Sequence, residues 1–223
     1  MFPISDSIRH RKFPIITLLI ISINIIVFLY ELISGQNFIE RWGLIPANVD
    51  FLNVNSFAPF ITSQFLHGGF FHIISNMWFL WVFGNNVEDR MGKLVFPLFY
   101  LTAGVAAALL QYIFNTTSVI PMIGASGAVS GVLGAYFVFF PQAKIRSLLF
   151  FFFTITIAYI PATIYIFYWF VIQVISGVAS IPALAGGAGG VAFWAHVGGF
   201  VAGYIIAKLY REEKKYIEGE IIE

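Results

Sequence analysis

Long stretches of this chain carry no charged residue, and this feature limits its possible folds more than any other. No Asp, Glu, Lys or Arg lies between Lys93 and Lys144, or in the run from Ser147 to Val178. Of the 223 residues, 59% are hydrophobic and 10% are charged, whereas about a quarter of the residues in a soluble domain are charged. A helix needs about 20 apolar residues to cross a bilayer. The sequence therefore predicts a polytopic membrane protein that forms one domain over residues 1–223.

The apolar runs predict six membrane spans. Their approximate bounds are 14–33, 67–86, 94–114, 122–140, 160–178 and 191–210. The long run after Ser147 is counted as one span because two spans would need about 40 residues and a turn. Its first part, Leu148–Tyr159, is predicted to be interfacial and partly extended. The apolar loop Ser34–Gln64 is expected to fold on the membrane surface with short helices, and Ala179–Gly190 is expected to be a flexible loop.

Lysine and arginine predict the orientation of these spans. They cluster before the first span, in a hydrophilic link Val87–Lys93, after the fourth span and in the C-terminal tail. These residues are Arg9, Arg11 and Lys12, then Arg90 and Lys93, then Lys144 and Arg146, and finally Lys208, Arg211, Lys214 and Lys215. The other three loops hold one basic residue, Arg41. With six spans, both termini are therefore predicted to lie in the cytoplasm.

The second, fourth and sixth spans run in the same direction, and each carries polar residues near its start. These residues are His72 and Asn76, then Ser126, then His196. At about 1.5 Å per residue, all of them lie roughly 6–14 Å below the same membrane boundary. A hydroxyl and a neutral imidazole at one depth can form the hydrogen bond of a nucleophile and its base. His72 and Asn76, four residues apart, share a helix face and can both donate hydrogen bonds.

Glycines surround the serine and the last histidine. Gly124 and Gly127 flank the Ala-Ser pair, Gly131 continues a stripe along the fourth span, and Gly199 and Gly203 follow His196. Two glycine stripes let two helix backbones approach closely. Such contact would bring the hydroxyl of Ser126 within hydrogen-bond reach of the imidazole of His196. The helix start also offers free backbone N–H groups, which can bind a developing oxyanion.

Each of these features also has a structural explanation. A small residue, a histidine or an asparagine inside a span is more often a helix contact than a catalytic group. For His67, at a span boundary, a structural role is favoured, and Glu88 and Arg90 are expected to form an ion pair or to anchor a loop. The catalytic interpretation gains weight because three separate motifs reach the same depth.

Several other chemistries are excluded by composition. The chain has no cysteine, and its aspartates, Asp6, Asp50 and Asp89, are not deep in any span, which excludes thiol and aspartyl catalysis. It has no H-E-x-x-H motif, and we expect no metal and no cofactor. The net charge of +1 gives no sign of nucleic-acid binding. The predicted spans show no buried charge that would suggest an ion or proton pathway, which counts against an ion-coupled transporter.

Four motifs of this chain resemble those of the rhomboid intramembrane serine proteases. They are H-G-G-F-F-H-I-I-S-N at 67–76, V-E-D-R-M-G at 87–92, G-A-S-G at 124–127 and A-H-V-G-G-F-V-A-G at 195–203. The resemblance extends over about residues 60–208. It implies an all-α membrane protein, a rhomboid-like bundle of six transmembrane helices of the bacterial and archaeal type, in a prokaryotic plasma membrane.

The resemblance also implies roles for individual residues. Ser126 would be the nucleophile and His196 the general base of a dyad, while His72, Asn76 and the backbone N–H of Ser126 would form the oxyanion hole. The fifth span would act as a lateral gate and the loop Ala179–Gly190 as a cap. Many members carry an aromatic residue four positions after the serine, where this chain has Ser130. Another residue must therefore orient the imidazole of His196.

The implied function is hydrolysis of transmembrane protein substrates at the lipid bilayer through an acyl-enzyme. Such substrates must unwind near the cut, because a helix hides its carbonyl groups in its own hydrogen bonds. Two alternatives remain: a catalytically silent relative that binds membrane proteins, and, less favoured, a passive transporter. The sequence does not predict the oligomeric state.

Overall fold

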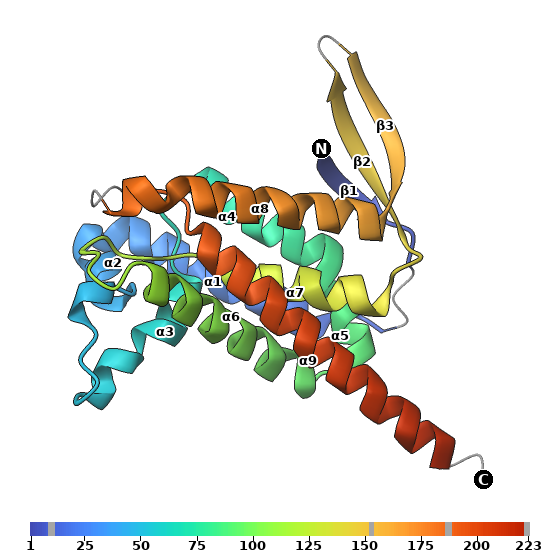
Figure 1. Ribbon diagram of the computed structural model, residues 1–223, viewed down its shortest axis with the longest axis horizontal. Helices are drawn as coiled ribbons and strands as arrows, with labels where there is room; N and C mark the ends of the chain where they lie inside the picture. Colours follow the sequence, from blue (N-terminus) through green and yellow to red (C-terminus); the bar gives the residue numbers. More distant parts are fainter. Residues whose placement is uncertain (9–11, 152–153, 186–188, 221–223) are drawn as a thin grey trace.

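The computed structural model describes residues 1–8, 12–151, 154–185 and 189–220, and helices make up most of this part of the chain (Figure 1). The main helices are α1 (Ile15–Ser34), α4 (Phe70–Phe79), α5 (Asn85–Met91), α6 (Val95–Phe114), α7 (Ser126–Phe139), α8 (Ala162–Ala185) and α9 (Phe193–Glu220). Arg9 and Arg11, which contributed to the predicted orientation, lie outside the described residues.

Three helices in the described part of the chain are long and apolar enough to cross a membrane. They are α1, α6 and residues Ala162–Ala183 of α8. The α7 helix is apolar but has only 14 residues, about 21 Å at 1.5 Å per residue. The mostly helical membrane fold is therefore as predicted, whereas the count of six spans and the orientation of the termini stay predictions.

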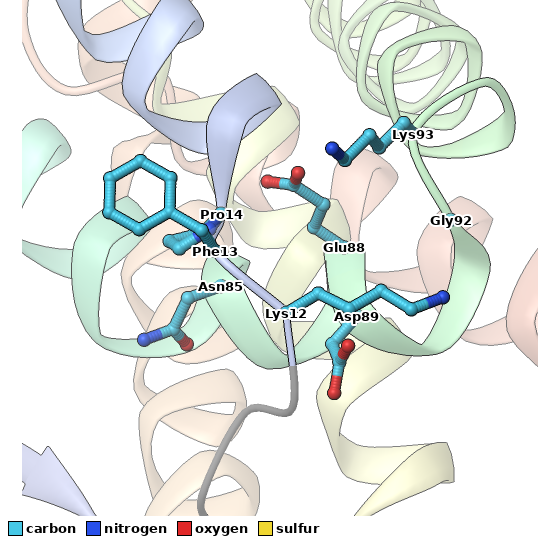
Figure 2. Close-up of a pocket in the computed structure, with 8 residues that line it drawn as sticks. All are labelled: Lys12, Phe13, Pro14, Asn85, Glu88, Asp89, Gly92 and Lys93. Atoms are coloured by element: carbon cyan, nitrogen blue, oxygen red, sulfur yellow. The ribbon is translucent and has the colours of Figure 1, made fainter.

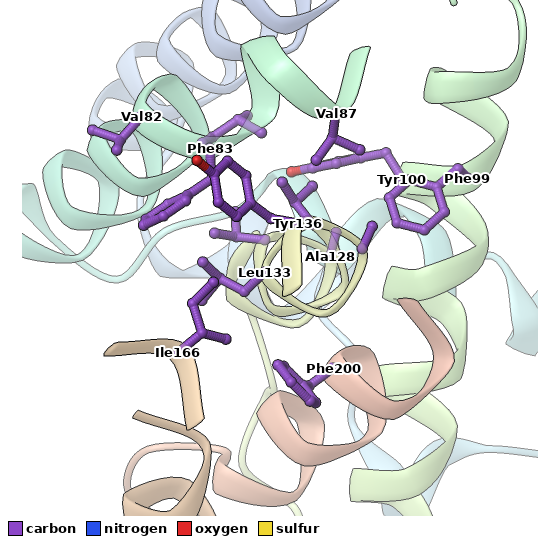
Figure 3. Close-up of a cluster of buried hydrophobic side chains, with 14 of the residues drawn as sticks. Val82, Phe83, Val87, Phe99, Tyr100, Ala128, Leu133, Tyr136, Ile166 and Phe200 are labelled. Atoms are coloured by element: carbon purple, nitrogen blue, oxygen red, sulfur yellow. The ribbon is translucent and has the colours of Figure 1, made fainter. Parts of the chain in front are cut away.

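The α7 helix lies at the centre of the hydrophobic core. Eleven of its 14 residues are buried. Figure 3 shows it surrounded by side chains from the neighbouring helices, among them Val82, Val87, Tyr100, Ile166 and Phe200. Because α7 meets protein on most sides, small residues that pack closely suit it better than long lipid-facing ones.

The second predicted span, 67–86, has different bounds in the structure. Its helix begins at Phe70 and continues from α4 through a π-helical turn, η4 (Leu80–Gly84), into α5. The segment Val87–Lys93, predicted to be a hydrophilic link, is therefore mostly helical. A charged residue can lie in this helix because the carboxylate of Glu88 has partners that replace water.

Those partners belong to the first turn of α1. The carboxylate of Glu88 accepts hydrogen bonds from the backbone N–H of Ile16 at 3.0 Å, and from the N–H and hydroxyl of Thr17 at 2.7 and 2.8 Å. Figure 2 shows Glu88 reaching from α5 toward the start of α1. The predicted anchoring role of Glu88 thus takes the form of a helix cap supplied by another helix.

The other spans also begin or end away from their predicted positions. The fourth starts at Ser126 rather than 122, because Met122 pairs with Leu44 through backbone hydrogen bonds of 2.8 and 3.1 Å. The fifth runs over 162–185 instead of 160–178, so the first part of the predicted flexible loop 179–190 is helical. The sixth runs over 193–220 instead of 191–210. Residues 186–188 of the predicted cap lie outside the described residues.

The prediction of an all-α fold is wrong, because the chain also forms a three-stranded antiparallel sheet. Its strands are β1 (Phe2–Asp6), β2 (Lys144–Phe151) and β3 (Thr154–Pro161), in the order β1-β2-β3. The described residues of the segment predicted to be partly extended, 148–151 and 154–159, are thus confirmed as strand, while its interfacial position stays a prediction. The carboxylate of Asp6 accepts hydrogen bonds from Asn86, at 2.6 Å, and from the hydroxyl of Tyr136. These bonds fasten the N-terminal strand to α5 and α7.

The loop after α1 folds into short helices, as predicted. They are α2 (Gln36–Trp42), η1 (Pro46–Asn48), η2 (Val54–Phe57), α3 (Pro59–Thr62) and η3 (Ser63–Phe65). This loop supports the segment before α7, since the N–H of Ala47 donates to Ser118 O at 3.0 Å and the N–H of Gly124 donates to Ser63 O at 2.9 Å. The approach to Ser126 is therefore held by residues about 60 to 80 positions earlier in the chain.

The Glu88 cap predicts a stability effect. Glu88→Gln removes the charge and one acceptor oxygen, leaving the start of α1 incompletely satisfied. We expect the free energy of unfolding to fall by about 1–2 kcal/mol, measured as a lower unfolding midpoint in detergent. Glu40→Gln, a matched change of an exposed glutamate, should leave the midpoint unchanged. Equal midpoints for the two variants would contradict the capping role.

Candidate functional site

The candidate site forms where the backbones of α7 and α9 touch. A Cβ atom placed on Gly199 would lie 1.9 Å from Gly127 O, and one on Gly203 would lie 2.0 Å from Gly131 O. No side chain fits at either distance, so the two glycine stripes meet backbone to backbone. Ser126 directly precedes Gly127, and His196 lies three residues before Gly199 on the facing helix.

Ser126 is the first residue of α7 and is partly buried. It lines a pocket of about 300 Å³ together with Ser63, Gln64, Gly124 and Ala195, among others. The position at the helix start leaves its backbone N–H without an intrahelical acceptor. The pocket therefore places a hydroxyl beside a backbone N–H donor that has no acceptor within its own helix.

Gln173, from α8, holds the imidazole of His196. Its Oε1 lies 2.8 Å from His196 Nδ1, and the Gln173 side chain is buried at 8% exposure. An amide oxygen only accepts, so Nδ1 carries the proton and Nε2 is the free, basic nitrogen. Gln173 thus favours this tautomer of His196. Ser130, four residues after Ser126, donates from its Oγ to Ser126 O at 2.6 Å.

His72, from α4, lies close to Gly124 and Ser126. A Cβ atom on Gly124 would lie 2.7 Å from His72 Nε2 and 3.7 Å from Ser126 Oγ, so the imidazole occupies the space that a side chain at 124 would take. Gly124 also has a φ of +127°, which L side chains rarely adopt. Only glycine at this position lets His72 approach Ser126.

Asn76, one turn after His72, is buried at 6% exposure, and its Nδ2 has no hydrogen-bond partner. A buried amide donor without an acceptor costs free energy, which a functional acceptor would recover.

His67 contacts His72. The two ring centroids are 5.1 Å apart, and the backbone N–H of His67 donates to Glu31 Oε2 at 3.0 Å. Glu31, on α1, is itself buried at 4% exposure.

Glu88 and Arg90 lie away from this pocket. Glu88 caps α1, and the guanidinium of Arg90 lies 6.0 Å from the ring centroid of Phe139, the last residue of α7. A second pocket of about 340 Å³ lies at this end, with Lys12 and Lys93 beside Glu88 (Figure 2), and it contains no residue predicted for the catalytic site. In the described part of the chain, no three His, Asp or Glu side chains cluster where they could hold a metal ion.

Two glutamines near the site had no role in the sequence analysis. Besides Gln173, Gln111 accepts a 3.2 Å hydrogen bond from the backbone N–H of Ala195, in the first turn of α9. Each is the sole amide side chain of its predicted span. An isolated amide in an uncharged span is costly unless it has a partner, and this signal could have identified both residues.

The glycine contact predicts that the cost of a Gly→Ala substitution to stability depends strongly on its position. Gly199→Ala would push a Cβ into the Gly127 carbonyl and force α7 and α9 apart. We expect the free energy of unfolding to fall by about 1–3 kcal/mol, measured by thermal unfolding in detergent. Gly190→Ala is the matched control, because nothing lies within 4 Å of a Cβ there. Similar midpoints for the two variants would mean that the helices can separate freely.

Comparison with known proteins gives a family match over most of the chain. Residues 54–213 match the Rhomboid domain. The chain is 33% identical over 131 residues to Rhomboid protein 1, mitochondrial, of Saccharomyces cerevisiae, covering 56% of this chain and 37% of that protein. It is 34% identical over 89 residues to Presenilin-associated rhomboid-like protein A, mitochondrial, of Danio rerio, covering 39% and 23%. For RHOMBOID-like protein 6, mitochondrial, of Arabidopsis thaliana, the identity is 36% over 75 residues, covering 34% and 24%.

These matches correct the predicted location. The chain spans less than half the length of each of these relatives, and all three are named mitochondrial. The prokaryotic plasma membrane expected from the sequence is therefore wrong. Apolar runs and basic loops define a bilayer and its two sides, but they carry no information on which membrane it is.

Proposed function

Because the chain belongs to the rhomboid family, we propose that it is an intramembrane serine protease that cleaves transmembrane proteins with Ser126 and His196. The observation that carries this proposal is the backbone contact between Gly127 and Gly199, which is flanked by the serine on α7 and the histidine on α9. The orientation of His196 by Gln173 adds support, because it leaves the basic nitrogen Nε2 available.

In the proposed reaction, Ser126 Oγ attacks the carbonyl carbon of the scissile bond while His196 Nε2 accepts the hydroxyl proton. His72, the unpaired Nδ2 of Asn76 and the backbone N–H of Ser126 donate to the resulting oxyanion. The C–N bond then breaks, and His196 returns the proton to the leaving amine. Water, deprotonated by the same histidine, hydrolyses the acyl-enzyme.

The path for the substrate is proposed to pass beside the segment before α7. A pocket of about 400 Å³ lies between residues 118–122 and 189–192 and adjoins the start of α9. This pocket shares Met122 and Ala192 with the pocket that Ser126 lines, so an unwound substrate segment in it would pass beside Ser126 with its carbonyl groups exposed. Substrates with helix-breaking residues near the membrane boundary are therefore expected.

We propose that six helical segments cross the bilayer: α1, α4 with α5, α6, α7, α8 and α9. An even number of crossings puts both termini on one side, the side that carries Lys12, Lys93 and Lys144. The names of the relatives support a mitochondrial membrane as the location.

Substitution of the dyad gives the direct test. Ser126→Ala and His196→Ala should each lower cleavage of a model transmembrane substrate in vesicles by about 10³-fold or more. Ser34→Ala, at the end of α1, should cleave like the parent protein. Retained cleavage in either dyad variant would refute the assignment. A parent protein that binds transmembrane peptides without cutting them would identify a catalytically silent relative instead.

Gln173 provides a separate test of how His196 is positioned. Gln173→Leu removes the acceptor at Nδ1 and should lower kcat by roughly 10- to 100-fold while KM changes little. Gln173→Glu keeps an acceptor and should restore part of kcat, with an altered pH profile. Gln142→Leu, an exposed glutamine after α7, is the matched control. An unchanged kcat in Gln173→Leu would show that the imidazole needs no such partner.

A further inference from the structure

The outer part of the β2–β3 hairpin exposes large apolar side chains. Phe150, Ile155, Ile157 and Tyr159 are 63%, 65%, 47% and 65% exposed. Residues 147–161 carry no charge. A contiguous exposed apolar patch of this kind marks an interaction surface.

The strand register gathers these side chains on one face. Leu148 pairs with Ile157, Phe150 with Ile155 and Arg146 with Tyr159. Residues directly opposite each other in an antiparallel pair point to the same side of the sheet. We call this side the apolar face; the exposed basic residues Lys144 and Arg146 lie on it near the base of the hairpin.

The opposite face has a different character. Near its base, Ile145 and Ser147 are fully buried against the helices. Toward the tip, it carries the exposed Thr154 and Thr156 and the partly buried Ala158, with the partly buried Leu149 of β2 opposite Thr156. The hairpin therefore carries exposed aliphatic and aromatic side chains along one face, whereas the outer part of the other face mixes threonines with apolar residues.

The hairpin is fixed at the level where α8 begins. The N–H of Ala162, the first residue of α8, donates to Ala143 O at 2.8 Å, just before β2. Figure 1 shows β2 and β3 running across the direction of α8 and leaning back along it rather than extending beyond its end. The side chains of Ile164 and Phe167 on the first turns of α8 are about as exposed, at 61% and 59%, and α8 is long and apolar enough to span a membrane. The hairpin thus leaves the helices at the level where an apolar, membrane-spanning helix begins.

We propose that the apolar face of the β2–β3 hairpin lies in the boundary between headgroups and acyl chains of the leaflet where α8 begins, with Lys144 and Arg146 on the phosphates of anionic lipids. Tyrosine and basic side chains favour this depth. A deeper position is excluded because β3 is an edge strand, whose unpaired backbone groups need water.

A protein partner that adds a strand to β3 fits the observations less well. Strand addition would satisfy the backbone edge of β3 but would leave the apolar face uncovered. Lipid covers that face and leaves the edge in contact with interfacial water. The basic pair on the same face also complements an anionic surface.

Single-cysteine labelling tests the proposal cleanly, because the chain has no cysteine of its own. Ile157→Cys and its neighbour Thr156→Cys place an environment-sensitive fluorophore on opposite faces of β3. In vesicles of phosphatidylcholine and phosphatidylglycerol, the label at 157 should emit at shorter wavelength. It should also be quenched by nitroxide-bearing lipid more than by iodide. The label at 156 should show the reverse. The measurement can use the Ser126→Ala protein, so it does not depend on protease activity.

Two outcomes would overturn the proposal. Equal access of iodide to both labels would place the apolar face in water, and a label at 157 that neither quencher reaches would place it against protein. The basic pair is tested by omitting phosphatidylglycerol, which should reduce lipid quenching at 157 in the parent protein but not in a Lys144→Gln/Arg146→Gln variant. Identical lipid quenching of the parent in both mixtures would exclude the phosphate contact.

Discussion

The backbone contact between α7 and α9 is the constraint on which the rest of the structure depends. Lipid is as apolar as the side chains, so helices in a bilayer associate through close packing rather than through the hydrophobic effect. Here the packing is extreme: Gly127 and Gly131 lie under Gly199 and Gly203, and alanines of α6 close the same layer. One requirement, the absence of side chains, thereby sets both the helix spacing and the register of Ser126 with His196.

Long polar side chains have a second structural role, because they accept hydrogen bonds from backbone N–H groups at the starts of helices and segments. Glu88 accepts from the first turn of α1, Glu31 from the backbone of His67, and Gln111 from the first turn of α9. Gln173 does the same for the His196 ring. Each acceptor comes from a different helix than the group it serves. In an apolar surrounding, these bonds replace water and also fix how neighbouring helices meet.

Sequence reasoning succeeded where a property depends on a single segment. Long uncharged runs predicted the helices, and the alternation of large apolar residues with Thr and Ala at 155–159 indicated extended structure. It failed where distant segments decide the outcome. The sheet needs β1, a polar-looking N-terminal stretch that pairs with residues about 140 positions later. The start of α7 depends on Leu44, which holds Met122 in an extended conformation. Gln173 gains its meaning only from the position of His196 on another helix.

The cap on α1 has a consequence for biosynthesis. Glu88 follows Thr17 by 71 residues in the chain, so α1 can form and enter the bilayer before the carboxylate that completes its first turn is in place. During that interval the segment is held by its apolar length alone and can slide along its axis. The arrival of α5 then locks its vertical position. The final register of the first helix is thus decided late, by a residue of α5.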